Sequence, residues 1–391
     1  MLREGWRQCR MGDLFESRRE RGRPGLPLLS VTMNDGLVDR DDLDRKQDSA
    51  LAPEEHLLVK PGDIAYNMMR MWQGAFGLSD REGMVSPAYV VLKPRPGTNS
   101  EFAAHLLRSD RLRYLLWAYS YGITDDRLRL YYQDFAAIRV CIPDARRQEG
   151  IAHALSSLDS LIATVEQLIA VHQQEKRALM RRHLAPTHTR QWRDHGWLRL
   201  QLGEIADIDR KSLSTATAKD CRFRYISLAD VADGRIRDSL EEYEFSAAPS
   251  RARRLVDPGD VLMATVRPNL KSYAVVGEEH RGHVASTGFA VITCKKGVLP
   301  EYLYQYLFSD DVQRQINALV AGSNYPAIGS SDVADLLLNV PDEDVQAKLA
   351  SFFGVQDRKI SVLEKYAERL RLERRALSQR LLVERPLWEP K

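Results

Sequence analysis

The sequence predicts an α+β fold in which two similar domains are each followed by a long helix, with the two helices packed on each other. Three observations predict this fold. The chain repeats itself at an offset of about 198 residues, each repeat begins with short β-rich runs between turn signals, and each repeat ends in a heptad pattern. A period of this length indicates a duplicated domain rather than a solenoid, so the chain forms an internal pseudo-dimer.

The composition is that of a soluble globular protein. The 391 residues are 44% hydrophobic and 28% charged, which excludes wholesale disorder and is enough chain for two to three domains. The formal net charge of +3 is too small to indicate a polyanionic partner by itself. Four scattered cysteines argue against a disulfide framework or a zinc ribbon, and no long apolar run is present, so we expect a cytoplasmic protein with no membrane partner.

The two copies of the repeat align at their turns and at the starts of their helices. Pro143-Asp144 aligns with Pro341-Asp342, and the register then holds through a whole helix. Further matches join Gly12-Asp13-Leu14 to Gly203-Glu204-Ile205, Pro61-Gly62-Asp63 to Pro258-Gly259-Asp260, Ser109-Asp110 to Ser309-Asp310, Gln148 to Gln346, and Arg177-Ala178-Leu179 to Arg375-Ala376-Leu377.

Each domain combines short strands with one helical segment. A Pro-Gly-Asp turn separates two expected strands, a helix follows, and an apolar strand closes the domain. The expected strands of the first repeat are 57–60, 64–66 and 138–142. In the second repeat, 256–263 contains the same strand, turn and strand, and 336–340 is the last strand. The expected helices are 101–117 and 301–320.

The segments after Pro143 and Pro341 have the pattern of long helices. Apolar residues recur there at alternating spacings of three and four over about 39 residues, a rod of roughly 60 Å. The seam also has polar members, His172 and Gln356 at d-like positions and Lys176 and Arg374 at a-like positions, which either specify the pairing register or mark solvated helix ends. The predicted divisions are a first domain at 1–145, a first long helix at 146–186, a linker with the second domain at 187–340, and a second long helix with a C-terminal tail at 341–391.

Enzyme signatures are weak. Asp342 followed by Asp357 and Lys359 imitates the acidic and lysine residues that hold Mg²⁺ in many nucleases. However, residues two apart on a helix point in different directions, and the first repeat has Leu161 where the second has Lys359. The sequence contains no Walker loop, H-E-x-x-H, G-x-S-x-G or metal-ligand cluster. We therefore predict a non-catalytic chain and keep the nuclease as an alternative.

DNA binding is the favoured class. Polar and aromatic residues gather in loops that follow matched strands and in a second loop before the last strand of each domain. Arginine reads guanine, asparagine or glutamine reads adenine, and lysine or tyrosine holds phosphates. The candidates are Asn67, Arg70, Trp72, Gln73, Tyr121, Thr124, Arg127 and Arg129 in the first domain, and Arg267, Asn269, Lys271, Tyr273, Ser323, Asn324 and Tyr325 in the second.

Two further features bear on this interpretation. The second loops of the two domains occupy equivalent places but differ in nearly every residue, so we expect them to read different ligands. Basic residues also concentrate between 176 and 199, where a surplus of about six positive charges suits phosphate neutralisation or a solvated helix end. The basic residues are Lys176, Arg177, Arg181, Arg182, Arg190, Arg193 and Arg199, against Asp194 alone.

The doubled order of these cues resembles the specificity subunit of type I restriction-modification systems, over essentially the whole chain. The cues are the Gly-Asp-Leu or Gly-Glu-Ile start, the Pro-Gly-Asp turn, the strand ending in Ile-Pro or Val-Pro before a helical Gln, and the Arg-Ala-Leu helix end. The resemblance implies two target recognition domains, each binding one half of a bipartite asymmetric DNA site, and an antiparallel coiled coil that acts as a ruler between the halves. The segment His183–His188 departs from the usual exit of the first helix.

The resemblance also implies partners. Two methyltransferase subunits would methylate adenine with S-adenosylmethionine, and two restriction subunits would add ATP- and Mg²⁺-dependent translocation and cleavage, so this chain itself would carry no cofactor or metal. Two alternatives stay open: the specificity module of another restriction or phage-defence methylation system, and a protein–protein scaffold that binds no DNA.

Overall fold

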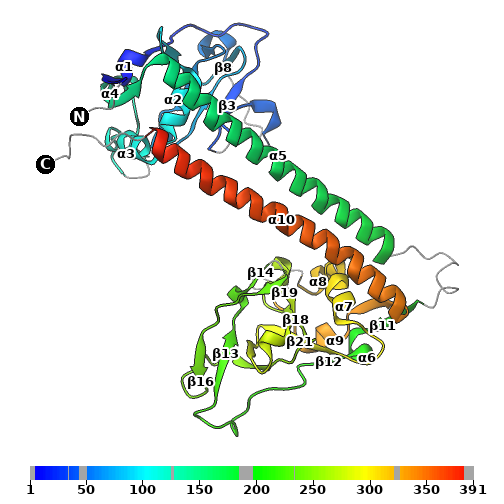
Figure 1. Ribbon diagram of the computed structural model, residues 1–391. Helices are drawn as coiled ribbons and strands as arrows, with labels where there is room; N and C mark the ends of the chain where they lie inside the picture. The colour runs from blue at the N-terminus through cyan, green and yellow to red at the C-terminus, as the bar shows by residue number, and fades with distance from the viewer. Residues whose placement is uncertain are drawn as a thin grey trace. The chain divides into compact units, whose positions relative to one another are not determined.

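The computed structural model describes residues 5–33, 35–43, 51–124, 127–184, 197–232, 234–320 and 326–382. The chain divides into two compact units: residues up to Val165 together with those from Tyr366 onward, and Glu166–Lys365. Each unit contains one β-rich domain and about half of each of two long helices, α5 (Ala145–Leu184) and α10 (Glu343–Leu382) (Figure 1). The two predicted helices are therefore confirmed.

The domain of the first unit is built on a four-stranded antiparallel sheet with the strand order β2-β9-β6-β7. Three antiparallel pairs, β1-β10, β3-β4 and β5-β8, accompany the sheet. The strands are β1 (Trp6–Arg10), β2 (Phe15–Ser17), β3 (Leu29–Val31), β4 (Leu37–Asp39), β5 (Leu57–Val59), β6 (Ile64–Asn67), β7 (Phe76–Leu78), β8 (Gly83–Val85), β9 (Tyr89–Pro94) and β10 (Arg139–Pro143); the helices are α1 (Met11–Leu14), α2 (Ser100–Leu107), α3 (Asp110–Ala118) and α4 (Tyr132–Ala137), with the 3₁₀ turns η1 (Arg40–Asp42), η2 (Pro53–Glu55) and η3 (Met71–Gln73).

The domain of the second unit repeats this topology, as the sequence predicts. The sheet β12-β21-β18-β19 and the pair β11-β22 correspond to β2-β9-β6-β7 and β1-β10. The pair β17-β20 corresponds to β5-β8 and is extended by β13 and β16 into a second sheet, β16-β13-β20-β17, while the pair β14-β15 is added. The strands are β11 (Leu198–Gln201), β12 (Ala206–Ile208), β13 (Arg222–Ile226), β14 (Val231–Ala232), β15 (Arg235–Ile236), β16 (Glu242–Glu244), β17 (Ala252–Leu255), β18 (Val261–Ala264), β19 (Tyr273–Val275), β20 (Val284–Ser286), β21 (Phe289–Cys294) and β22 (Leu337–Val340); the helices are α6 (Leu202–Ile205), α7 (Pro300–Leu307), α8 (Asp310–Val320) and α9 (Ser330–Ala334), with η6 (Leu228–Asp230), η7 (Pro268–Leu270) and η8 (Glu278–His280).

The single helix predicted in each domain is two helices. Ser109 lies between α2 and α3, and its side-chain oxygen accepts a hydrogen bond from the backbone N–H of Leu112. Ser309 does the same for Val312 at the start of α8. Serine is a favoured N-cap because its oxygen satisfies a free N–H of the first turn, so the repeated Ser-Asp pair begins a new helix.

The repeated Gln148 and Gln346 join each domain to the helix that follows it. The amide of Gln148 donates to the carbonyl oxygen of Pro143 (2.9 Å) and accepts from the N–H of Asn99 (3.0 Å). The amide of Gln346 makes the equivalent bonds to Pro341 (2.7 Å) and Leu299 (2.9 Å). Both glutamines are buried, and buried amides need such partners. The motif is thus a structural clamp.

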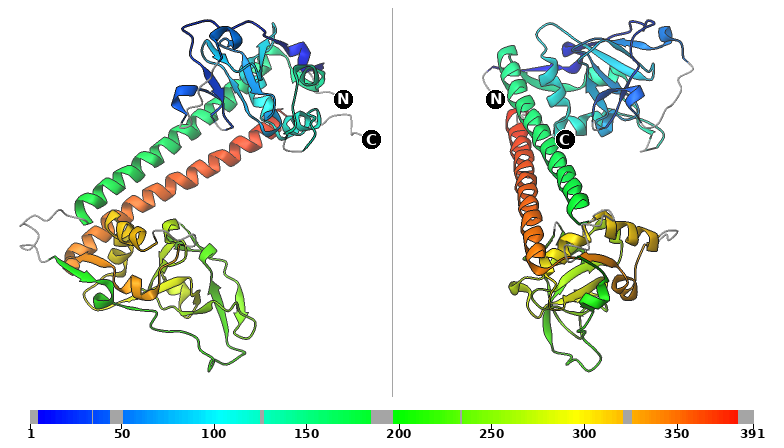
Figure 2. Two further views of the ribbon diagram at one scale, coloured as in Figure 1. Left: turned by 180° about the vertical axis from the view of Figure 1, so that it is seen from behind. Right: turned by 90° about the vertical axis from the view of Figure 1, so that its right-hand side faces the viewer.

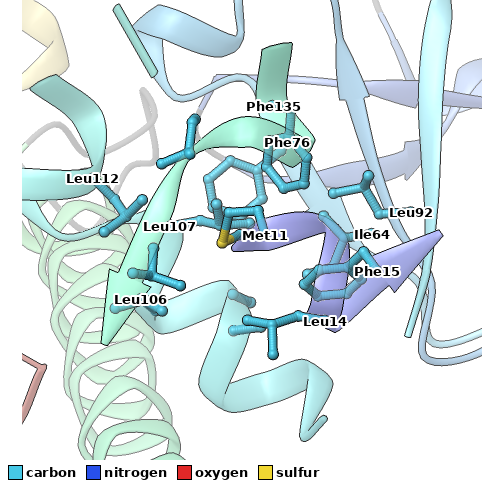
Figure 3. Packing of buried hydrophobic residues seen from close by; sticks show 14 of the residues in the cluster. Met11, Leu14, Phe15, Ile64, Phe76, Leu92, Leu106, Leu107, Leu112 and Phe135 are labelled. Carbon is cyan, nitrogen blue, oxygen red and sulfur yellow. The ribbon is translucent and has the colours of Figure 1, made fainter. Parts of the chain in front are cut away.

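Each domain core includes residues of both long helices. In the first unit the core cluster contains Leu155 of α5 and Leu382 of α10, and in the second it contains Leu184 and Phe353. Figure 3 shows part of the first cluster, where the sheet and the short helices meet. The helices therefore contribute to the folding of each domain.

Ion pairs between α5 and α10 account for two of the polar seam residues. In the first unit Arg374 donates from Nε and Nη2 to the two carboxylate oxygens of Asp159, at 2.9 and 3.2 Å. In the second unit Lys176 Nζ lies 2.5 Å from Oδ1 of Asp357. Within each unit, residue numbers rise along one helix as they fall along the other, so the two helix segments of that unit lie side by side and antiparallel (Figures 1 and 2). Lys176 and Arg374 are pairing residues rather than solvated ends.

Candidate nucleic-acid interface

In the first domain, the loop after β6 presents some of its predicted side chains to solvent and uses others internally. Asn67 accepts from the N–H of Met69 (3.0 Å), and the indole N–H of Trp72 donates to the Met69 carbonyl (3.1 Å). Arg70 and Gln73 are exposed and their side chains have no partner among the described residues. Asn67 and Trp72 therefore shape the loop, while Arg70 and Gln73 are available to a ligand.

The second candidate loop of this domain is held against the first. Tyr121 and Arg129 exchange backbone hydrogen bonds of 3.1 and 2.9 Å, and the N–H of Leu130 donates to the carbonyl of Met68 (2.9 Å). The rings of Tyr121 and Tyr131 lie 5.6 Å apart. The predicted residues Tyr121, Thr124, Arg127 and Arg129 are all exposed. Two segments far apart in sequence thus form one polar and aromatic surface.

The second domain joins its two candidate loops in the same way. The N–H of Arg267 donates to the carbonyl of Pro326 (2.8 Å), and the N–H of Ile328 donates to Thr265 (3.0 Å). Arg267, Asn269 and Lys271 are exposed. Ser323, Asn324 and Tyr325 lie outside the described residues. The repeat therefore places an equivalent pair of joined loops on each domain.

The prediction that Tyr273 contacts DNA is wrong. Tyr273 begins β19, is fully buried, and packs its ring 5.1 Å from the ring of Phe308. The sequence pattern misled because the loop ends at Ser272, and Tyr273 is already the first residue of a strand in which Tyr273 and Ala274 are both fully buried. Burial raises the pKa of its hydroxyl.

Three of the five described basic residues of the segment 176–199 form ion pairs within the fold. Lys176 pairs with Asp357, Arg181 with Asp310 at 3.1 Å, and Arg199 with Asp311 at 2.5 Å. In the described part of the segment, Arg177 and Arg182 are exposed without an ion-pair partner, and Arg190 and Arg193 lie outside the described residues.

Arg177 lies near the loop that follows β18 in the second domain. Burial lowers the pKa of Lys271, Arg177 lowers it further, and Asp310 opposes the shift. The positive charge of Arg177, in the last turns of α5, therefore acts on Lys271 in this loop.

The carboxylates of the nuclease alternative have structural partners. Asp342 accepts a hydrogen bond from the N–H of Val345 (2.9 Å) and caps α10. Asp357 holds Lys176 and also accepts from the amide of Gln305 (2.7 Å). Among the described residues, no group of three His, Cys, Asp or Glu side chains is arranged to hold a metal ion. Asp342 and Asp357 thus have structural roles in this fold.

Sequence reasoning missed exposed apolar side chains beside the predicted arginines. Met69 precedes Arg70, and Leu270 lies between Asn269 and Lys271; both are exposed. Tyr114 and Trp117 on α3, which packs against η3, are also exposed, with rings 5.8 Å apart. Only Leu270 had a sequence signal, because it stands as a single apolar residue between Asn269 and Lys271.

One helix in the described part of the chain, α5, has a stretch apolar enough and is long enough to cross a membrane by length and composition alone. This helix packs against α10 in both units, which accounts for part of its apolar sequence.

Comparison with known proteins confirms the predicted resemblance. No family model matches the chain. The specificity subunit of the type I restriction enzyme HindI from Haemophilus influenzae is 30% identical over 117 residues, which is 29% of this chain and 26% of that relative. The chain thus matches only about a quarter of the relative's length.

Two solved structures share the fold over nearly the whole chain. The crystal structure of the type I restriction-modification S subunit from M. genitalium has a TM-score of 0.62 and 14% identity, with 99% of each chain covered. A chain from a study of assembly and conformational transition of the type I R-M system has a TM-score of 0.54 and 18% identity, with 98% of each chain covered. The chain is similar in sequence and in fold to type I specificity subunits.

Proposed function

We propose that this chain is the non-catalytic DNA-recognition subunit of a type I restriction-modification complex. One observation carries the proposal: each domain of a doubled fold presents a pair of hydrogen-bonded loops at the same place, and the exposed residues of the two pairs differ. Two equivalent surfaces with unlike side chains suit the two unlike halves of a bipartite asymmetric DNA site. The recognition domains in this proposal span 1–145 and 187–340.

In this proposal the long helices of the segments 146–186 and 341–391 act as the ruler that sets the distance between the half-sites. Two modules joined rigidly gain effective concentration on one duplex, and both engage only where the half-sites have the matching separation. The pairs Asp159–Arg374 and Lys176–Asp357 support a defined helix register. A change in helix length is expected to alter the spacer and leave both half-sites unchanged.

The partners are double-stranded DNA, two methyltransferase subunits and two restriction subunits. Exposed apolar side chains on the long helices support docking of the methyltransferase subunits, because a partner that covers them removes their apolar area from water. These side chains are Leu161, Leu168 and Val171 of α5 and Phe352, Val355 and Val362 of α10. In this proposal S-adenosylmethionine, ATP and Mg²⁺ bind to the partners, and the complex acts in the cytoplasm.

Co-expression with the methyltransferase subunit encoded beside this chain, followed by single-molecule sequencing of methylated adenines, tests the proposal. The expected result is a bipartite motif with two unlike halves and a fixed spacer. Exchanging 12–143 for the same region of another such subunit is expected to change one half-site only. A stable complex that methylates nothing would contradict DNA reading, and an unchanged motif after the exchange would contradict the division of labour.

Single substitutions show which residues contact bases. Arg70→Ala is expected to relax one half-site and Arg267→Ala the other, each by roughly 1–3 kcal/mol of discrimination. Arg113→Ala, which removes an exposed arginine of α3, is the matched control. Binding that weakens with rising salt separates DNA recognition from the scaffold alternative, because phosphate contacts release counterions. The partner that copurifies separates the type I system from another restriction or phage-defence system.

A further inference from the structure

The turn between β18 and β19 has a strained backbone. Arg267 and Lys271 flank η7, and both adopt the left-handed conformation, with φ of 50° and 53°. Residues with a Cβ avoid this region because the Cβ approaches the following carbonyl oxygen. Hydrogen bonds hold the turn: Leu270 N–H to the Arg267 carbonyl (2.9 Å), Lys271 N–H to Pro268 (3.0 Å), and Arg267 N–H to Pro326 (2.8 Å). The turn is therefore rigid.

The first domain builds the equivalent turn without this strain. Arg70, at the place of Arg267, has φ of −130°, and Gly74, at the place of Lys271, takes the left-handed conformation that glycine adopts freely. Glycine at 271 would relieve the strain. Strain that persists where the fold offers a relaxed alternative points to a role for the side chains, since strained residues cluster at ligand-binding sites.

The turn projects one large apolar side chain into solvent. Leu270 is 64% exposed, and its sequence neighbours Asn269 and Lys271 are exposed polar residues. A single exposed leucine is common on protein surfaces, but this one is fixed by a strained, hydrogen-bonded turn between two candidate DNA readers. Such a side chain gains burial only when a ligand covers it.

The apolar group that DNA offers in the major groove is the C5-methyl of thymine, next to the base edges that arginine and asparagine read. Building on the proposed function, we propose that Leu270 is a specificity-determining residue that packs on the C5-methyl of a thymine in the half-site read by the second domain. Arg267 and Asn269 hydrogen-bond neighbouring base edges, and the strained turn holds the three side chains in one arrangement.

Uracil substitution tests this contact directly, since uracil lacks the methyl group and keeps the pairing edge of thymine. Once the motif is known, the complex with the methyltransferase subunit is assayed on duplexes in which each thymine of the site is replaced by uracil, one at a time. For the wild-type complex we expect an affinity loss of about fourfold at one thymine of one half-site, the value of burying one methyl group.

The Leu270→Ala complex is expected to bind the thymine duplex about fourfold or more weakly and to lose nothing further on uracil substitution. Leu198→Ala removes another exposed leucine of the same unit and serves as the matched control; it is expected to keep the wild-type response. Thermal unfolding shows whether both variants fold.

Three results would overturn the assignment. One is an identical uracil response in the wild-type and Leu270→Ala complexes, and another is a half-site without thymine. The third is a Leu270→Ala complex that bends DNA less than the wild-type complex does, when uracil substitution has no effect on binding. This result would identify Leu270 as a wedge inserted between base steps instead. A wild-type complex that methylates no bipartite site would overturn the proposed function itself, and this is read out before any variant is compared.

Discussion

Removing the carboxylate of Asp357 tests whether the ion pairs between α5 and α10 fix their register. In the second unit its two oxygens hold Lys176 Nζ at 2.5 Å and Gln305 Nε2 at 2.7 Å. The side chain of Lys176 is 12% exposed and Gln305 is buried. Asp357→Ala therefore leaves a mostly buried ammonium and a buried amide without their partner.

The expected cost follows from this burial. Breaking a fully buried ion pair by removing one partner costs about 3–5 kcal/mol, and the 37% exposure of Asp357 reduces this to roughly 2–3 kcal/mol. The unit Glu166–Lys365 spans about 200 residues, and an unfolding entropy of about 2.1 cal/mol/K per residue then gives a fall in Tm of about 5–7 °C.

Thermal and urea unfolding of the full chain measure the change. Lys359→Ala removes an exposed charge two residues away and is expected to stay within about 0.5 kcal/mol of the wild type. Exchanging the charges, with Lys176→Asp and Asp357→Lys together, is expected to recover part of the loss. Asp357→Ala with wild-type stability would refute the reasoning, and so would a double exchange no better than the worse single variant.

Two further predictions concern single residues of the two domains. Burial lowers the pKa of His105 to about 4, below the usual 6.5, so the unfolded chain takes up a proton at a higher pH than the folded chain does. This contribution to stability is complete above pH 6.5 and is lost as the pH falls toward 4, by roughly 1–3 kcal/mol. His105→Gln, which installs the residue found at the equivalent place as Gln305, is expected to flatten unfolding free energy against pH in this window; an unchanged slope would contradict the assignment. Lys271→Gly is expected to raise the unfolding free energy by up to about 1 kcal/mol because it relieves the left-handed strain, while it weakens DNA binding by the complex. Calorimetry and a salt titration of binding check both effects, and a Lys271→Gly protein that is destabilised or binds DNA with full affinity would show that the residue has another role.

Local signals were sufficient for the two long helices and for the Pro-Gly-Asp turns. Glycine in Pro61-Gly62-Asp63 and Pro258-Gly259-Asp260 adopts φ of 87° and 88°, which the turn requires and which sequence alone indicates. The heptad spacing located both long helices because amphipathic periodicity is written within the segment itself. The sequence did not predict the break between α2 and α3 at Ser109. One serine inside an apolar helical pattern is a weak signal for a helix end, and its hydrogen bond from Leu112 N–H is visible only in the structure.

The partners of the polar seam residues required the structure. Lys176 was open to two interpretations because its partner, Asp357, lies on another helix, and antiparallel packing determines which carboxylate it meets. The prediction that Tyr273 contacts DNA was wrong for a related reason. Tyr273 lies at the start of β19 rather than in the loop, and this position depends on pairing with β18.

The sequence by itself determined that the chain is a duplicated α+β domain with a long helix after each copy, because repeats, turns and heptads are local patterns. Only the tertiary structure decided which loop residues form a surface. Hydrogen bonds from Leu130 to Met68 and from Arg267 to Pro326 join segments about 60 residues apart. Such contacts arise from strand pairing and core packing, whose free energy is shared among residues distant in sequence, so no local pattern specifies them.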